Sequence, residues 1–226
     1  MSHTAIQTPP PVLAAIRGTD ATFPVRRIFC VGRNYAAHRR EMGGDDRDPP
    51  FFFTKPADAV VASGSRIPYA RATTNLHHEV ELVVAIGSGG EDIPVADALT
   101  HVFGYAVGVD LTRRDLQADS KDKGQPWDSA KGFDQSAPLG AITPAAGAAW
   151  TGAIRLSVNA AARQDADLAD MIWSVPEIIS ECSRLWALKP GDLIYTGTPE
   201  GVGPLVAGDH VLAAIDGLDD LSFNIG

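Results

Sequence analysis

The ten-residue run that begins at His77, HHEVELVVAI, constrains this chain more than any other segment. Its second half is apolar and of strand length, whereas its first half carries ionisable groups. Side chains alternate between the two faces of a strand, so His77, Glu79 and Glu81 share one face. Two carboxylates beside a buried strand repel each other and are costly to desolvate unless a cation joins them. The pattern therefore indicates a cation site at the start of a buried strand.

A third carboxylate follows the next apolar run. Residues 105–109 are strand-like and end at Asp110, which a strand end can present to the same site. Three oxygen ligands without a cysteine are typical of a site for Mg²⁺ or Mn²⁺. Each residue also has a plainer explanation. Glu79 and Glu81 would suit the solvent face of an edge strand, and Asp110 would suit a helix N-cap.

A second candidate group lies nearer the N-terminus. We expect a short helix over residues 34–42 and then a mobile loop over residues 43–50, which include two glycines and two prolines. His38 and Glu41 are three residues apart and would share one face of that helix. The carboxylate can orient the imidazole, which can then take a proton from water. A surface pair without function explains the same spacing, so the pattern needs support from elsewhere.

Short β-like runs dominate the rest of the chain and predict a strand-rich α+β protein. They cover residues 27–31, 51–53, 80–86, 102–109, 154–158, 193–196, 211–215 and 221–225. Residues 1–24 include three consecutive prolines, and we assign them to an N-terminal arm. We assign residues 25–226 to a single catalytic domain, which is long enough to bury its own core.

One long helix is expected from Ser174 onward. The sequence SVPE has the capping-box spacing and places a proline in the first turn, where it is tolerated. Pro190-Gly191 would end the helix. The apolar stripe of this helix is expected to consist of Ile178, Cys182, Leu185 and Trp186.

Charge and composition exclude several classes of partner. The chain has 28 acidic and 19 basic residues, a formal charge of −9, which gives no attraction to nucleic acid or anionic lipid. No stretch approaches the roughly 18 apolar residues of a membrane span, and the N-terminus lacks the regions of a signal peptide. Only two cysteines are present, without a CxxC pair. We therefore expect a cytoplasmic protein that acts on a small molecule.

Six segments together resemble the fumarylacetoacetate hydrolase superfamily. They occur in family order and are GRNYAAH at residues 32–38, FTKP at 53–56, HHEVEL at 77–82, DLTRRD at 110–115, AKGFD at 130–134 and TGTPEGVGP at 196–204. Each segment alone is a weak signal, but the set covers nearly the whole chain from residue 27 onward. The KGQPW stretch at residues 123–127 is most similar to the acylpyruvase branch, which includes the fumarylpyruvate hydrolases of gentisate breakdown.

The resemblance implies a mixed β-roll with a short lid helix, and it assigns roles to particular residues. The metal-ligand positions of the family correspond to Glu79, Glu81 and Asp110. The water-activating pair on the lid helix corresponds to His38 and Glu41. Substrate-contacting positions correspond to Gln117, Lys131 and Thr198, although Gly132 follows Lys131 where the family more often has serine.

The chemistry implied by the resemblance is metal-dependent hydrolysis of a carbon–carbon bond in an acylpyruvate, either fumarylpyruvate or its cis isomer maleylpyruvate. His38 with Glu41 would activate water, and Gln117 and Lys131 would stabilise the oxyanion, while the metal would bind the 2-keto acid end. Pyruvate and a dicarboxylic acid would result. A counter-charge for the second carboxylate would come from Arg33, Arg39, Arg40 and Lys55, each equally explained as a solvated surface cation.

Two other functions fit the same residues. The nearer one is decarboxylation or keto–enol tautomerisation of oxaloacetate, and the more distant one is a non-catalytic binding protein on this fold. The metal ligands together with the His38 and Glu41 pair argue against the second. We also expect a homodimer, because the resemblance and a β-rich chain with many strand edges favour it.

Overall fold

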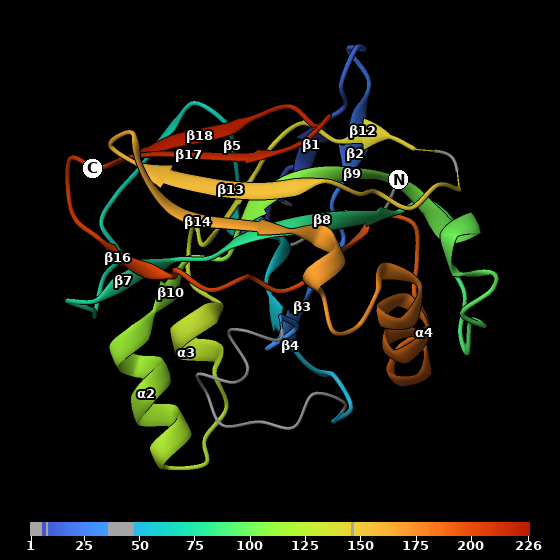
Figure 1. Ribbon diagram of the computed structural model, residues 1–226, viewed down its shortest axis with the longest axis horizontal. Coiled ribbons are helices and arrows are strands. Elements are labelled where there is room, and N and C mark those ends of the chain that lie inside the picture. The colour runs from blue at the N-terminus through green and yellow to red at the C-terminus, as the bar shows by residue number, and fades with distance from the viewer. Residues whose placement is uncertain (1–5, 8, 36–47, 146) are drawn as a thin grey trace.

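Two β-sheets lie one over the other (Figure 1). Apolar side chains pack between them. The structure is a computed structural model and describes residues 6–7, 9–35, 48–145 and 147–226. The larger sheet consists of β3 (Arg27–Gly32), β4 (Phe51–Lys55), β5 (Val60–Ala62), β8 (Val80–Ile86), β9 (Val102–Val109), β11 (Ala137–Leu139), β12 (Thr143–Pro144) and β15 (Asp192–Tyr195). Its order is β4-β3-β15-β8-β9-β11-β5, and β12 pairs with β9.

The second sheet has five strands and contacts the larger sheet through β8, β9 and β11. In spatial order its strands are β14 (Ala161–Asp167), β13 (Ala153–Val158), β17 (His210–Ile215), β18 (Leu221–Ile225) and β6 (Ser65–Ile67). The pairs β3/β15, β5/β11 and β6/β18 are parallel, and the other pairs in these two sheets are antiparallel. The expected strand-rich, mixed β architecture is therefore confirmed, and β8, β9 and β18 have the bounds that the sequence indicates.

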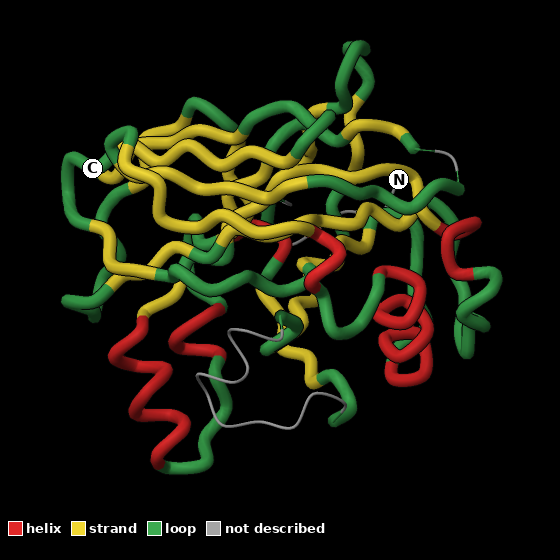
Figure 2. The backbone as a smooth tube through the Cα atoms, in the orientation of Figure 1, coloured by secondary structure: helices red, strands yellow, loops and turns green. Residues whose placement is uncertain are grey.

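Helices and two small sheets lie at the periphery of the two main sheets (Figure 2). The α-helices of the described residues are α2 (Arg114–Asp122), α3 (Asp128–Lys131) and α4 (Val175–Leu185), and the 3₁₀ helices are η1 (Ala57–Ala59), η2 (Ala98–His101) and η3 (Leu168–Asp170). One small sheet pairs β1 (Leu13–Ala15) with β2 (Thr22–Pro24). The other has β7 (Leu76–His78) between β10 (Thr112–Arg113) and β16 (Gly203–Leu205).

Strand β8 is buried on both faces, which explains its continuous apolar run. Val80, Leu82 and Val84 belong to the main core between the sheets. Val83 and Ala85 point the other way, into a second apolar cluster. A charged side chain on either face of this strand is therefore enclosed by protein.

Helix α4 begins as the sequence predicts but ends earlier. The capping box is formed, since the backbone N–H of Ser174 donates to Glu177 Oε2 at 2.9 Å. The helix ends at Leu185 because Trp186 is extended and its ring packs 4.9 Å from that of Phe29. The expectation that Pro190-Gly191 ends the helix is therefore wrong. The expectation that Leu185 belongs to the apolar stripe is also wrong, because 61% of Leu185 is exposed. Ile179 is buried there instead.

The segment assigned to an N-terminal arm contains the hairpin β1–β2. Ala14 and Phe23 of this hairpin are buried in the second apolar cluster, and the N–H of Arg17 donates to the carbonyl of Ile142 at 2.9 Å. The arm at residues 1–24 and the domain at residues 25–226 stay a prediction. No helix among the described residues has the length and apolarity that a membrane crossing requires.

The helix expected over residues 34–42 falls mostly outside the described residues. Asn34 and Tyr35 are described and are not helical, so the expected start is wrong. Tyr35 forms an isolated β-bridge with Met171, and Asn34 is fully buried. The Asn34 amide donates to the carbonyls of Trp173 at 3.0 Å and Thr196 at 2.8 Å. These contacts connect Asn34 to the segments that contain Trp173 and Thr196. His38, Glu41, Arg39 and Arg40 lie outside the described residues.

Gly201 is expected to be far less tolerant of a side chain than Gly208. Both have positive φ, +88° and +95°, so alanine at either costs about 1–2 kcal/mol of backbone strain. A Cβ atom at Gly201 would also lie 2.1 Å from the carbonyl oxygen of Arg163, whereas nothing lies within 4 Å at Gly208. Urea denaturation should therefore show Gly201→Ala less stable than Gly208→Ala by roughly 1–3 kcal/mol. Equal losses would contradict the close approach of these two segments.

Candidate functional site

Glu79 and Glu81 stand at the beginning of β8, inside the protein. Glu79 links β7 to β8, and Glu81 is the second residue of β8. Strand β8 lies between β15 and β9 in the larger sheet, so it is not an edge strand. The exposed fractions of Glu79 and Glu81 are 5% and 1%. The plainer explanation, the solvent face of an edge strand, is therefore wrong.

Asp110 joins these two carboxylates because β8 and β9 are antiparallel neighbours. Val80 pairs with Val109, and the N–H of Asp110 donates to the carbonyl of Glu79 at 2.8 Å. Asp110 is fully buried, and α2 starts four residues later, so the N-cap explanation is also wrong. One oxygen from each of Glu79, Glu81 and Asp110 can be chosen so that all lie within 4.8 Å of one another.

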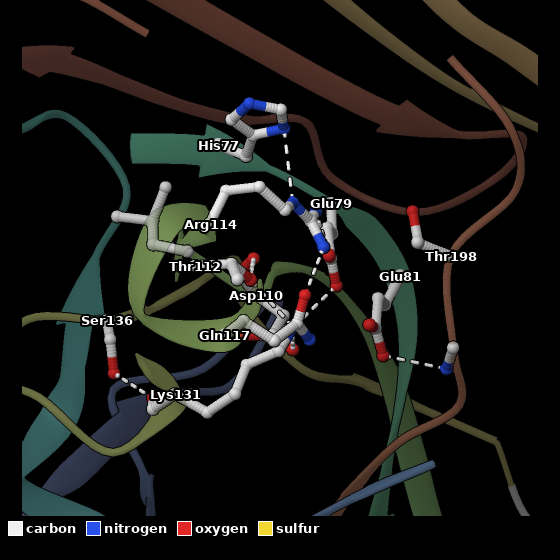
Figure 3. A network of polar contacts seen from close by, with 12 residues as sticks. His77, Glu79, Glu81, Asp110, Thr112, Arg114, Gln117, Lys131, Ser136 and Thr198 are labelled. Carbon is white, nitrogen blue, oxygen red and sulfur yellow. Dashed lines mark hydrogen bonds and ion pairs between the residues drawn. The ribbon is translucent and has the colours of Figure 1, made fainter. Parts of the chain in front are cut away.

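Two buried lysines neutralise part of this cluster. Lys131 Nζ, from the last residue of α3, lies 2.7 Å from Glu79 Oε2, 2.6 Å from Asp110 Oδ2 and 2.6 Å from Thr112 Oγ1 (Figure 3). Burial lowers the pKa of Lys131, but Asp110 and Glu79 outweigh it, so the pKa is raised overall. Lys55 Nζ lies 2.7 Å from Asp110 Oδ1.

The position of Lys55 corrects one expectation from the sequence. Its side chain is fully buried against Asp110 and is neither a solvated surface cation nor a free counter-charge for a substrate. The sequence gives no sign of this contact, because Lys55 and Asp110 come from β4 and the end of β9. Only the packing of these segments brings the two charges together.

Arg114 links Glu79 to the helix α2. Its guanidinium pairs with Glu79 Oε1, donates to His77 Nδ1 at 3.3 Å and donates to Gln117 Oε1 at 2.6 Å (Figure 3). Burial raises the pKa of Glu79, but Lys131 and Arg114 outweigh it and hold this pKa below its ordinary value. Arg114 belongs to the DLTRRD segment at residues 110–115. This segment contributes to the family resemblance, but no role was assigned to Arg114 from the sequence.

Glu81 is the carboxylate of the three without a cationic partner among the described residues. It accepts the backbone N–H of Gly197 at 2.7 Å. Burial, followed by Asp110 and Glu79, raises its pKa well above the ordinary value. A cation placed among the three carboxylates would supply the charge that Glu81 lacks. Buried oxygen donors in this number fit Mg²⁺ or Mn²⁺, which prefer carboxylate ligands.

A pocket adjoins the carboxylates and brings the predicted substrate residues together. Its volume is about 370 Å³, part of which is open to solvent. The predicted residues that line it are Arg33, Glu79, Glu81, Gln117, Lys131 and Thr198. Arg114, Lys121 and Trp127 line it as well. His38 and Glu41 lie outside the described residues.

A buried glutamine supports the pocket wall from behind. Gln164 of β14 donates to Thr198 Oγ1 at 2.8 Å and to the carbonyl of Pro199 at 3.0 Å. Its Oε1 accepts the N–H of Val80 at 3.1 Å and lies 3.0 Å from His78 Nδ1. It thus joins the Thr198 loop to the strand that carries the carboxylates. The sequence gives only a weak sign of this role, because Gln164 is a single polar residue at an inward-facing position of β14.

Comparison with known proteins gives consistent similarities. Residues 27–225 match the family described as Fumarylacetoacetate (FAA) hydrolase C-terminal. A fumarylpyruvate hydrolase of Ralstonia sp is 44% identical over 177 residues, which cover 78% of this chain and 92% of that protein. A mitochondrial oxaloacetate tautomerase of Mus musculus is 44% identical over 202 residues, which cover 88% and 91%. The crystal structure of fumarylpyruvate hydrolase from Pseudomonas aeruginosa, in complex with Mn²⁺ and pyruvate, has a TM-score of 0.95, 53% identity and 99% coverage of both chains.

Gln164→Leu should destabilise the fold, because it leaves the buried polar groups of Val80, Thr198 and Pro199 without this partner. Each unsatisfied buried group costs about 1–3 kcal/mol, so we expect a loss of at least roughly 2 kcal/mol in the free energy of unfolding. Urea denaturation measures it. The control is Arg163→Leu at the exposed neighbouring position, which should change stability by about 0.5 kcal/mol or less. Equal stability of the two variants would refute this role of Gln164.

Proposed function

The chain belongs to the fumarylacetoacetate hydrolase family, and from that premise we propose that it hydrolyses the carbon–carbon bond of an acylpyruvate. The proposed substrate is fumarylpyruvate or its cis isomer maleylpyruvate, and the products are pyruvate and a dicarboxylic acid. The observation that carries the proposal is the buried group of Glu79, Glu81 and Asp110 beside a pocket lined by Gln117 and Lys131. The 53% identity to a fumarylpyruvate hydrolase supports the choice of substrate.

We propose that Glu79, Glu81 and Asp110 hold a Mg²⁺ or Mn²⁺ ion. Such an ion supplies Lewis-acid polarisation of the 2-keto acid end of the substrate. The three carboxylates are fixed by neighbouring strands and need no rearrangement of the backbone to face one another. Mn²⁺ in the Pseudomonas aeruginosa structure supports this choice of ion.

Gln117 is suited to donate a hydrogen bond to the reacting carbonyl. Its Oε1 accepts a hydrogen bond from Arg114, which fixes the orientation of the amide. The NH₂ group can then donate to a ligand in the pocket. Lys131 directs its N–H groups at Glu79, Asp110 and Thr112, and we propose that it turns one of them to the substrate oxygen. Two donors aimed at a developing oxyanion would lower the barrier to attack on the carbonyl.

His38 is the proposed base, although it lies outside the described residues and its role rests on the family resemblance and on the spacing to Glu41. It would take a proton from water as the oxygen adds to the carbonyl of the acyl group. The bond from that carbon to the pyruvate methylene then breaks. Its electron pair passes into the pyruvate enolate, which takes up a proton to give pyruvate, and the acyl group leaves as a carboxylic acid.

A second candidate is keto–enol tautomerisation of oxaloacetate. It is favoured by the oxaloacetate tautomerase of Mus musculus, which is 44% identical to this chain. Oxaloacetate is also a 2-keto acid with acidic protons beside the carbonyl, so the same carboxylates and pocket would suit it. The homodimer and the cytoplasmic location expected from the sequence stay predictions.

The function is tested by a kinetic screen of fumarylpyruvate, maleylpyruvate, acetylpyruvate and oxaloacetate with Mg²⁺ and with Mn²⁺. We expect the highest kcat/KM with one of the two dicarboxylic acylpyruvates, and loss of activity after exhaustive chelation. Addition of Mg²⁺ or Mn²⁺ to the chelated protein should restore the activity. Turnover of oxaloacetate alone would replace the proposal with the second candidate, and full activity in protein shown to be metal-free would refute the metal requirement.

His38→Ala should separate catalysis from binding. If His38 activates water, its loss should reduce kcat by about 10²- to 10⁴-fold while the affinities for Mn²⁺ and for oxalate, which resembles pyruvate enolate, stay nearly unchanged. Glu79→Gln is the opposite control and should weaken Mn²⁺ binding in calorimetry. Near-normal hydrolysis of every accepted acylpyruvate by His38→Ala would exclude His38 as the base.

A further inference from the structure

One face of α2 extends from the carboxylate cluster along the pocket. Arg114, Gln117 and Lys121 are spaced by three and four residues, so they lie on the same face of the helix. All three line the pocket. Arg114 contacts Glu79, whereas Lys121 is one turn beyond Gln117, about 6 Å farther along the axis at 1.5 Å per residue. Lys121 therefore lines the pocket one helical turn farther from Arg114 than Gln117 does.

Lys121 is a partly buried cation without an anionic partner among the residues that the structure describes. Its ammonium lies 5.2 Å from the centre of the Trp127 ring and makes no ion pair there. Burial, followed by Arg114 and Arg33, lowers its pKa to about 8. Lys123, two residues later, is exposed and pairs with Asp119 at 3.1 Å. Of these two lysines, only Lys121 faces the pocket, and its surroundings favour an incoming anion.

We propose that Lys121 determines specificity by binding the distal carboxylate of a dicarboxylic substrate. The inference rests on the proposed function, in which the 2-keto acid end lies at the carboxylate cluster and Gln117 donates to the reacting carbonyl. In a fumaryl or maleyl substrate, a short two-carbon unit separates that carbonyl from the second carboxylate. Lys121 lies one helical turn beyond Gln117 on the face that lines the pocket, so a cation is present on the side of Gln117 away from Arg114. An acetyl group ends in a methyl group and has no carboxylate for Lys121 to bind.

The test compares the binding of two ligands of equal length by calorimetry with Mn²⁺-loaded protein. 2-Oxoheptanedioate has a distal carboxylate, and 2-oxoheptanoate has a methyl group in its place. Neither has the second keto group that cleavage requires, so binding is measured without turnover. Charge-assisted hydrogen bonds are worth about 10- to 100-fold in affinity. We expect the wild type to prefer the dicarboxylate by that factor, and Lys121→Met to abolish the preference while binding 2-oxoheptanoate as the wild type does.

Two further variants complete the design. Lys121→Arg keeps the charge and should keep most of the preference, and Lys123→Met removes an exposed charge from the same end of α2 and should leave it unchanged. Equal affinity of the wild type for both ligands, or an undiminished preference in Lys121→Met, would overturn the inference. Hydrolysis of fumarylpyruvate by the wild type is measured separately. A preference that depends on Lys121 in a protein that cleaves no acylpyruvate would uphold the inference and reject the proposed function.

Discussion

The burial of three carboxylates at one point is the constraint on which the rest of this site depends. An isolated carboxylate cannot be moved from water into a protein interior unless its charge is compensated. Here the compensation comes from three separate elements, since Lys55 lies on β4, Arg114 on α2 and Lys131 on α3. Each cation anchors its own element against the start of β8 or the end of β9. The electrostatic requirement thus fixes the positions of the helices that form the pocket.

The three carboxylates are not compensated equally by cationic side chains, and this difference leaves room for a metal ion. Glu79 and Asp110 each contact two cationic groups, while Glu81 has a backbone N–H and no cation among the described residues. The cluster therefore has a place for additional positive charge next to Glu81. Lys131 has the opposite property, because it is held by two carboxylates and a hydroxyl group and so remains charged in the interior. If one of its N–H groups turns to the substrate, as proposed above, the donor is a charged group that is already desolvated.

The sequence predicted the elements whose pattern is local and missed the contacts that depend on packing. The bounds of β8 and β9 could be predicted because apolar residues fill them, and the start of α4 because Ser174 and Glu177 are close in sequence. The end of α4 depends on the packing of Trp186 against Phe29, which are far apart in the chain. The partnership of Gln164 with Val80 and Thr198, and that of Lys55 with Asp110, likewise join distant segments. Propensity and spacing do not contain such information.

The same distinction explains why the substrate is harder to assign than the family. The carboxylate cluster would serve any 2-keto acid. Relatives with the names fumarylpyruvate hydrolase, at 44% and 53% identity, and oxaloacetate tautomerase, at 44% identity, are both similar to this chain. Tautomerisation only moves a proton next to the keto group, whereas hydrolysis must also activate water and stabilise charge on a second carbonyl. The residues that separate the two reactions therefore lie farther from the carboxylates. In the described part of the chain, the α2 face that bears Gln117 and Lys121 is where that difference in chemistry would be expressed.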